Sequence, residues 1–423
     1  MEVIVKPNKQ HDNDWMPAIP ENWDLKKTTW VFEKIGSGTT PKSENREYYD
    51  NGDINWILTG DLNDSYLKST SKKVTQKALE DFSTLTIYPR NSLVIAMYGA
   101  TIGKIALTDI DACTNQACCV LSEPINSNTK FYFYWFLANR QYIISLGYGG
   151  GQPNISQEII KSLRLPCPPI TEQKKIVISL DQKCALIDAL IEKKQKLVEL
   201  KKEERTALIN QVVTKGLDPN TPMKDSGIEW LGEIPEHWEV KRLKYCIELI
   251  MGQSPESEHY NFEGDGIPFL QGNADFGKIH PIPKVWTRHA NKICLKDDIF
   301  LSVRAPVGEL NIADQSYGIG RGLCALRPFA INRVFFYYLL IGLKEKLIKL
   351  ATGSTFTAVS VEDISNLMLP NPPIEEQKLI VELLEKQVKN SMQLSQQLTE
   401  QIELLKEYKT TLISEAVMGK LVI

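Results

Sequence analysis

The chain has 423 residues, 43% hydrophobic and 24% charged, with a net charge of −3. This composition excludes a generally disordered chain, and about 150 residues per domain predicts two to four domains. The acidic balance excludes a uniformly basic nucleic-acid binder, so DNA contact would need local surfaces. The sequence has no run of about 18 apolar residues and no signal-peptide pattern, so we expect a cytoplasmic protein without a membrane span. It has eight cysteines but no Cys-x-x-Cys pair, so we expect reduced thiols and no metal site.

The first half alternates short β-rich runs with turn residues and then becomes helical. Residues 92–97 and 117–121 have the composition of strands, and 131–146 are apolar at helical spacing. From 171 to 215 there is no proline; Pro168-Pro169 precedes this segment and Gly216 follows it. These signals predict a mixed domain at 1–170 and a long helix at 171–216.

The second half repeats this order. We expect strands at 298–303 and 323–326, a helix at 333–350, and a long helix over 375–423 with Gly419 near its end. The second mixed domain then covers 217–374. Because strands come first and helices last in each half, the predicted fold class is α+β.

The two halves are a duplication. Eleven of fifteen positions are identical between 163–177 (LRLPCPPITEQKKIV) and 367–381 (LMLPNPPIEEQKLIV). An Ile-Pro-Glu-x-Trp segment opens each half, at 19–23 and 234–238. Weaker parallels pair 57–61 with 269–273, 100–104 with 305–309, and 131–134 with 335–338. Units of about 200 residues are too long for a solenoid, so a whole domain-plus-helix unit is duplicated.

Both long helices carry apolar residues in the same heptad register. In the distal helix the two columns are Leu384, Ser391, Leu398, Leu405, Leu412 and Val388, Ser395, Ile402, Lys409, Ala416. In the central helix they are Leu180, Ile187, Lys194, Lys201, Leu208 and Cys184, Ile191, Val198, Arg205, Val212. Because polar residues interrupt each column, we expect the helices to pair. The short connection after Gly216 favours an antiparallel coiled coil with a pseudo-two-fold axis and one domain held at each end. Such an object suits the two-fold geometry of B-DNA.

Several segments resemble type I restriction-modification specificity subunits, over essentially the whole chain. They are 223–238 (MKDSGIEWLGEIPEHW), the repeated Leu-Pro-x-Pro-Pro-Ile-x-Glu-Gln-Lys at 165–174 and 369–378, and Gly-x-x-Pro at 38–41 and 252–255. The resemblance implies two target-recognition domains that each read half of a split, asymmetric DNA site. It also implies that the helices set the spacing and dock two methyltransferase subunits, which motor-nuclease subunits join. S-adenosylmethionine, ATP and Mg²⁺ would act on those partners, and this chain would hold no cofactor and no catalytic site.

Two other functions are weighed against this one: a self-sufficient DNA methyltransferase and a coiled-coil scaffold that binds only proteins. Asn371-Pro-Pro-Ile374 approaches an amino-methyltransferase motif, but the aromatic fourth residue is replaced by Ile, and the matching copy reads Cys167-Pro-Pro-Ile170. Gly149-Gly-Gly151 lacks the lysine and hydroxyl of a phosphate-binding loop, and Cys118-Cys119 alternate across a predicted strand. We interpret these as a rigid turn, a loop and core thiols.

Base reading needs Arg or Lys for guanine and Asn or Gln for adenine, on elements that reach the groove. Loop residues of these and other polar types are therefore the candidate DNA contacts. In the first half they are Lys42, Tyr98, Thr101, Lys104, Asn115, Gln116, Gln152 and Asn154; in the second half, Arg304, Glu309, Arg321, Thr352, Ser354 and Thr355. Because matched positions differ, as Gln116 and Arg321 do, the domains would read different sequences. The net acidity predicts weak, salt-sensitive DNA binding by the isolated chain. The charged helix faces at 193–196 and 203–205 are candidate docking surface for the methyltransferase.

Overall fold

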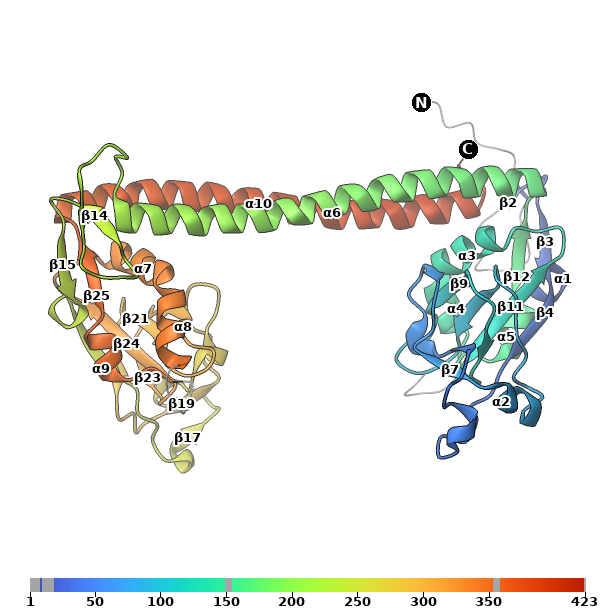
Figure 1. Cartoon of the computed structure of the whole chain (residues 1–423), viewed down its shortest axis with the longest axis horizontal. Helices are drawn as coiled ribbons and strands as arrows, with labels where there is room; N and C mark the ends of the chain where they lie inside the picture. The colour runs from blue at the N-terminus through green and yellow to red at the C-terminus, as the bar shows by residue number, and fades with distance from the viewer. Residues whose placement is uncertain (1–7, 10–18, 149–153, 353–357, 422–423) are drawn as a thin grey trace. The chain divides into compact units, whose positions relative to one another are not determined.

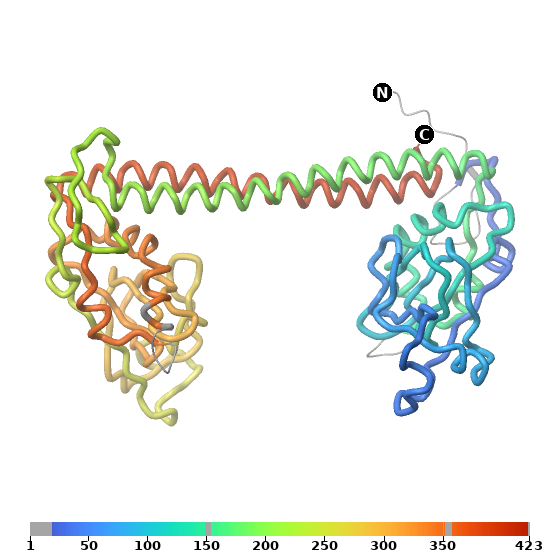
Figure 2. The backbone as a smooth tube through the Cα atoms, viewed as in Figure 1, coloured from blue at the N-terminus to red at the C-terminus, as the bar shows by residue number. Residues whose placement is uncertain are grey.

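The computed structural model describes residues 8–9, 19–148, 154–352 and 358–421 (Figures 1 and 2). It divides into two compact units. Unit 1 holds the described residues up to Lys194 and from Glu400 onward, and unit 2 holds Gln195–Thr399. Each unit therefore combines one β-rich domain, called here the first or second domain, with part of each long helix.

The first domain contains a five-stranded sheet and a three-stranded sheet. The larger has the order β4 (Phe32–Ser37), β11 (Cys118–Pro124), β8 (Leu93–Ala96), β9 (Ile105–Thr108) and β6 (Tyr66–Leu67); its pairs are antiparallel except β6 with β9. The smaller has the order β10 (Cys113–Thr114), β5 (Ile54–Ile57) and β7 (Lys72–Val74). Two-stranded pairs join β12 (Arg164–Cys167) to β3 (Asp24–Lys27) and β1 (Asn8–Lys9) to β2 (Ile19–Pro20). The short helices are α1 (Thr28–Val31), α2 (Gln76–Asp81), α3 (Thr129–Ala138), α4 (Arg140–Ser145), α5 (Gln157–Ser162), η1 (Arg46–Tyr48) and η2 (Thr59–Asp61).

The larger sheet of the first domain is buried on both faces. Leu93 and Ile95 of β8 belong to the core that packs on α3 and the long helices, whereas Val94 and Ala96 belong to a second core on the opposite face. Successive side chains of a strand point to opposite faces, so burial of both requires a continuous apolar run. The strands predicted at 92–97 and 117–121 are thereby confirmed.

The second domain repeats this plan. One sheet has the order β16 (Ile247–Met251), β24 (Leu323–Pro328), β21 (Ile299–Ser302) and β22 (Leu310–Ile312). The other has the order β17 (Tyr260–Asn261), β19 (Val285–Thr287), β18 (Ile267–Leu270), β23 (Tyr317–Ile319) and β20 (Ile293–Cys294). Pairs join β13 (Met223–Asp225) to β14 (Glu233–Pro235) and β15 (Glu239–Arg242) to β25 (Met368–Asn371). The helices are α7 (Arg333–Gly342), α8 (Lys344–Thr352), α9 (Val361–Ser365), η3 (Leu243–Tyr245), η4 (Ser257–His259) and η5 (Asn273–Asp275).

The apolar segments predicted as single helices at 131–146 and 333–350 are each two consecutive helices. The first breaks at Asn139, whose backbone leaves the helical region (φ −100°, ψ 14°) and whose side-chain amide donates to the carbonyl of Trp135 at 2.8 Å. A side chain that competes for a helical carbonyl in this way ends a helix locally. The second breaks at Leu343, between α7 and α8.

Each long segment forms one continuous helix: α6 spans Ile170–Lys215 and α10 spans Ile374–Val417. All members of the predicted heptad columns are buried or half-buried, which confirms the register. In unit 1, Lys409 Nζ lies 2.7 Å from Asp188 Oδ1, and Lys194 Nζ donates to Gln401 Oε1 at 2.6 Å. Because residues further along α6 pair with residues that come earlier in α10, the two helices are antiparallel, as predicted.

The glutamine that is repeated at the start of both long helices has a structural role. Gln173 is 1% exposed; its Oε1 accepts the amide of Asn128 at 2.8 Å, and its Nε2 donates to the carbonyl of Pro168 at 2.9 Å. Gln377 makes the equivalent bonds, at 2.7 Å to the amide of Asn332 and at 2.8 Å to the carbonyl of Pro372. Each glutamine therefore ties the Pro-Pro turn to the residue that caps the first aromatic helix of its own domain.

Each Ile-Pro-Glu-x-Trp segment packs against the glycine that follows a long helix. A Cβ on Gly216 would lie 3.3 Å from the ring of Trp238, and one on Gly419 would lie 3.0 Å from the ring of Trp23. Both glycines have positive φ, 78° and 71°, as is usual just after a helix. In unit 1, α10 thus returns to the start of the first domain. Within the described residues, neither α6, α10 nor any shorter helix has the length and apolar character needed to cross a membrane.

Candidate nucleic-acid interface

Strand register brings three loops of the first domain to one end of its larger sheet. Cys119 at the start of β11 pairs with Ser37 at the end of β4, and Cys118 pairs with Ala96 at the end of β8. The loops 38–42, 97–104 and 115–117 therefore leave the same sheet end. They carry six of the predicted contacts: Lys42, Tyr98, Thr101, Lys104, Asn115 and Gln116.

The second domain has the same arrangement. Cys324 pairs with Met251 at the end of β16, and Leu323 pairs with Ser302 at the end of β21. The loops 252–256, 303–309 and 320–322 meet there, and they carry Arg304, Glu309 and Arg321. The sequence identified these residues only as separate candidate contacts, and the strand register places their loops together at one end of each sheet.

The glycine of each Gly-x-x-Pro motif allows the first loop to approach the third. A Cβ on Gly38 would lie 1.7 Å from the carbonyl oxygen of Thr114, and one on Gly252 would lie 2.1 Å from that of Gly320. No side chain fits at these distances. The motif thus fixes two of the three loops against each other in both domains.

Several predicted contacts have structural roles. The Asn115 side chain accepts the amide of Ala117 at 3.1 Å, Lys344 bonds Glu309 at 2.7 Å, and the carbonyl of Thr101 accepts the amide of Lys104 at 2.9 Å. Tyr98 is half-buried against the core, and burial raises the pKa of its hydroxyl. The side chains of Asn115, Glu309 and Tyr98 are therefore less available to a ligand, whereas the bond of Thr101 involves only its backbone.

The remaining predicted contacts differ in what the structure describes. Lys42, Lys104, Gln116, Arg304 and Arg321 are exposed, and within the described part of the chain the two lysines and two arginines of this set have no side-chain ion pair. Asn154 is exposed, and its backbone pairs with that of Tyr148. Thr352 is the last residue of α8. Gln152, Ser354, Thr355 and the Gly149–Gly151 run lie outside the described residues.

Strand register also corrects one of the sequence parallels. Thr114 of β10 pairs with Ile57, and the corresponding Ile319 of β23 pairs with Leu270. Ile57 therefore matches Leu270 rather than Phe269, and the second domain has one more residue than the first between this strand and the short helix, η2 or η5, that follows it. The same alignment matches Gln116 with Arg321 and Lys42 with Glu256.

Residues that the sequence did not single out complete this end of each sheet. In the second domain Gln253, Ser254, Glu256, Gln271 and Arg321 line an open concavity of about 750 Å³. The amide of Arg321 donates to Ser254 Oγ at 3.3 Å. In the first domain Thr40 Oγ1 donates to Gln116 Oε1 at 2.6 Å. In both domains, the hydroxyl two residues after the glycine of the Gly-x-x-Pro motif thus contacts Gln116 or the matching Arg321. This correspondence is visible only after the two halves are aligned by their structures.

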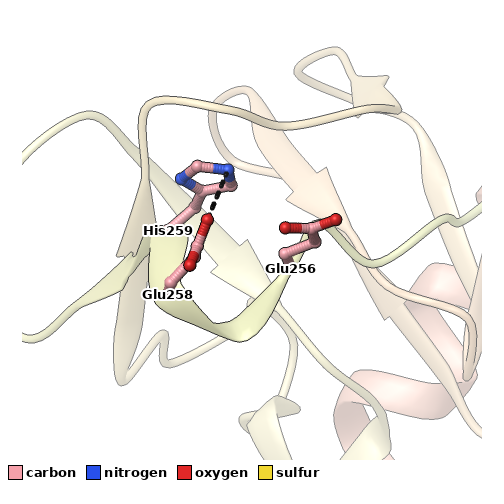
Figure 3. Close-up of side chains that lie close together, drawn as sticks. All are labelled: Glu256, Glu258 and His259. Carbon is pink, nitrogen blue, oxygen red and sulfur yellow. Dashed lines mark ion pairs between the residues drawn. The ribbon is translucent and has the colours of Figure 1, made fainter.

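Glu256 also belongs to a small acidic cluster (Figure 3). One ligand atom each from Glu256, Glu258 and His259 lie within 4.8 Å of one another, and His259 pairs with Glu258 at 3.9 Å. The His259 ring lies against that of His289, with 4.3 Å between centroids and a tilt of 34° between the ring planes. These side chains are exposed or half-exposed, and no further feature of the described residues indicates a bound cation.

Two of the motifs weighed as catalytic, at Asn371 and at Cys118-Cys119, lie within the described residues. Asn371 ends β25, one residue before the turn that starts α10, and its Oδ1 is buried without a hydrogen-bond partner. Its counterpart Cys167 contacts the hydroxyl of Tyr132 at 3.2 Å, a hydroxyl that Phe336 lacks in the second domain. All eight cysteines are free and buried. Burial raises the pKa of Cys118 and Cys119 to about 12, and their side chains lie in different cores.

Comparison with known proteins agrees with this architecture. The sequence profile of the type I restriction modification DNA specificity domain matches residues 20–201 and 235–404. The chain is 32% identical over 407 residues to the putative type I restriction enzyme MjaX specificity subunit of Methanocaldococcus jannaschii, covering 92% of each chain. It is 27% identical to the MjaIX specificity subunit of the same organism, covering 95% of this chain and 94% of that one.

Two solved structures share the fold along nearly the whole chain. One comes from work on complex assembly and conformational transition of the type I R-M system, with a TM-score of 0.71, 26% identity, and coverage of 95% and 99% of the two chains. The other is the HsdS subunit from Thermoanaerobacter tengcongensis, with a TM-score of 0.56, 26% identity, and coverage of 95% and 98%. With two tandem profile matches and a full-length relative at 32% identity, the chain belongs to the family of type I restriction-modification DNA specificity subunits.

Proposed function

We propose that this chain is the non-catalytic DNA-specificity subunit of a type I restriction-modification complex in the cytoplasm. Each domain reads one half of a split, asymmetric site in double-stranded DNA, and the paired helices set the distance between the halves. The observation that carries the proposal is the twice-repeated convergence of three loops at one sheet end, on a shared scaffold but with different exposed side chains.

The long helices provide a surface for protein partners. Beyond the residues that face the paired helix, α6 exposes Leu186 (71%) and Leu190 (43%) in unit 1, and Leu197 and Leu200 in unit 2. Apolar side chains exposed on the outer face of a paired helix favour a protein interface. We propose that two methyltransferase subunits dock on these helices, that motor-nuclease subunits join that core, and that S-adenosylmethionine, ATP and Mg²⁺ act there.

Co-expression with the cognate methyltransferase subunit tests recognition. Single-molecule methylation mapping should reveal one bipartite motif. Replacing the first domain with that of a relative should change one half of the motif and leave the other intact. Methylation without sequence preference, or a motif that changes in both halves, would contradict the proposal.

A separate pull-down tests docking. Leu186→Glu with Leu190→Glu should abolish co-purification of the methyltransferase, because charge on an apolar contact surface is strongly unfavourable. Gln195→Glu, at an exposed position of the same helix about half a turn around its axis from the leucine pair, adds one negative charge away from that surface and should leave co-purification unchanged. Intact co-purification of the leucine variant would place the partner elsewhere.

A further inference from the structure

We infer that Arg321 reads a guanine in the half-site of the second domain, and that Gln116 occupies the equivalent reading position in the first domain. The inference rests on the proposed function and adds to it the residue and the base.

The geometry of the 320–322 loop fixes the backbone of Arg321 and leaves its side chain free. The amide of Arg321 donates to Ser254 Oγ at 3.3 Å, and the amide of Gly320 donates to the carbonyl of Leu270 at 2.8 Å. A Cβ on Gly322 would lie 2.9 Å from the carbonyl oxygen of Gln271. The guanidinium is exposed, and no described residue forms an ion pair with it. An anchored loop that presents an unpaired guanidinium is suited to bind a ligand outside the chain.

The chemistry around Arg321 matches a G·C pair. A guanidinium donates two parallel hydrogen bonds to O6 and N7 of guanine, and a carboxylate accepts from the N4 amino group of cytosine. Glu256, which lines the same concavity, can supply that carboxylate, and Gln253 and Gln271 line the concavity as well. Glu256 would weaken a site that bound only phosphate, because its negative charge repels the phosphate backbone of DNA.

The first domain holds different chemistry at the same positions. Gln116 replaces Arg321, Lys42 replaces Glu256, and Leu58 follows Ile57 where Gln271 follows Leu270. Thr40 Oγ1 donates to Gln116 Oε1 at 2.6 Å, which orients the amide and leaves Nε2 available to donate and the second lone pair of Oε1 available to accept. A glutamine amide suits the N6 and N7 edge of adenine. Thr40 and Ser254 are therefore positioning residues for Gln116 and Arg321.

The test uses the assembled complex of the full chain with its methyltransferase subunit and maps methylated motifs. Arg321→Gln should reduce the preference for guanine at one position of one half-site by about tenfold to hundredfold, the discrimination of one bidentate contact. Arg321→Lys should retain part of the preference, because its single ammonium can still reach O6 or N7. Gln116→Ala should relax one position in the other half-site only.

A matched control uses the same substitution in the same domain. Arg333 pairs with Asp297, at the opposite end of β21 from Ser302, so Arg333→Gln should leave the motif unchanged. Melting temperatures of the complexes verify that each variant is folded. If Arg321→Gln lowers methylation equally at all sequences, Arg321 contacts phosphate and the inference is wrong. The inference is also wrong if Arg321→Gln leaves the motif unaltered, or if Gln116→Ala alters the same half-site as Arg321→Gln. A wild-type complex without any sequence preference would instead overturn the proposed function.

Discussion

The buried glutamine at the start of α6 allows a sharp test of what holds the first domain to its helix. Gln173 uses one side-chain atom as an acceptor, for the amide of Asn128, and the other as a donor, to the carbonyl of Pro168. Gln173→Glu keeps the shape and the acceptor. When ionised, the new carboxylate cannot donate, so two oxygens would face each other in a site that is 1% exposed.

The size of the effect follows from proton linkage. Burial and the facing carbonyl raise the pKa of the new carboxyl in the folded state above its unfolded value of about 4.3. The variant is therefore most stable below the unfolded pKa, and it loses stability as pH rises toward the folded pKa. Each pH unit in that window costs ~1.4 kcal/mol, so moving from pH 5 to pH 8 would cost up to about 4 kcal/mol. For units of this size, that is a fall of at most about 8–16 °C in melting temperature.

Differential scanning calorimetry of the full chain at pH 5 and pH 8 measures this, with wild type as the reference at each pH. Gln377→Glu should behave alike in unit 2, because Gln377 makes the same two bonds. Gln182→Glu, at an exposed position on the same helix, should show no such pH dependence. If Gln173→Glu differs from wild type by the same amount at both pH values, the donated bond to Pro168 does not stabilise the fold.

Three further outcomes follow from features described above. Seven residues inserted after both Lys194 and Glu400 keep the heptad register and add about 10 Å of helix. The spacer between the two mapped half-sites should therefore lengthen by about three base pairs. An active complex with an unchanged spacer would show that the helices do not set the distance between the half-sites. Gly419→Ala places a methyl 2.4 Å from a proline ring at positive φ and should destabilise the chain by ~1–3 kcal/mol in urea unfolding, whereas Gly60→Ala, with open space around it, should change stability by less than about 1 kcal/mol. Burial raises the pKa of thiols such as Cys324 to about 12, so at pH 8 a thiol reagent should label the eight cysteines only after denaturation; rapid labelling of the folded chain would contradict their burial.

The sequence carried enough information to predict the architecture. The duplication, the proline-free segments and the heptad columns predicted two mixed domains and an antiparallel helix pair, because burial on one helix face leaves a periodic record in the chain. Strand runs such as 92–97 were predictable for the same reason. The break at Asn139 was not, since an asparagine within an apolar helical segment shows its competing bond to Trp135 only in three dimensions.

The candidate interface was predictable only in part. Loop position and residue type pointed to Gln116 and Arg321, but not to Thr40 or Ser254, whose role depends on the close approach that Gly38 and Gly252 permit. The extra residue before η5 was hidden because the sequences 57–61 and 269–273 align without a gap, and the one-residue shift appears only in the strand register.

The boundary between the compact units falls inside both long helices, at Lys194 and Glu400, rather than at the edges of the β-rich domains. The buried glutamine and the tryptophan-on-glycine contact of each half lie within a single unit. Genetic recombination with crossovers at these mid-helix points would therefore exchange a recognition domain together with all of its own supporting contacts. Crossovers at the domain edges would instead separate each domain from the glutamine and the glycine that contact it.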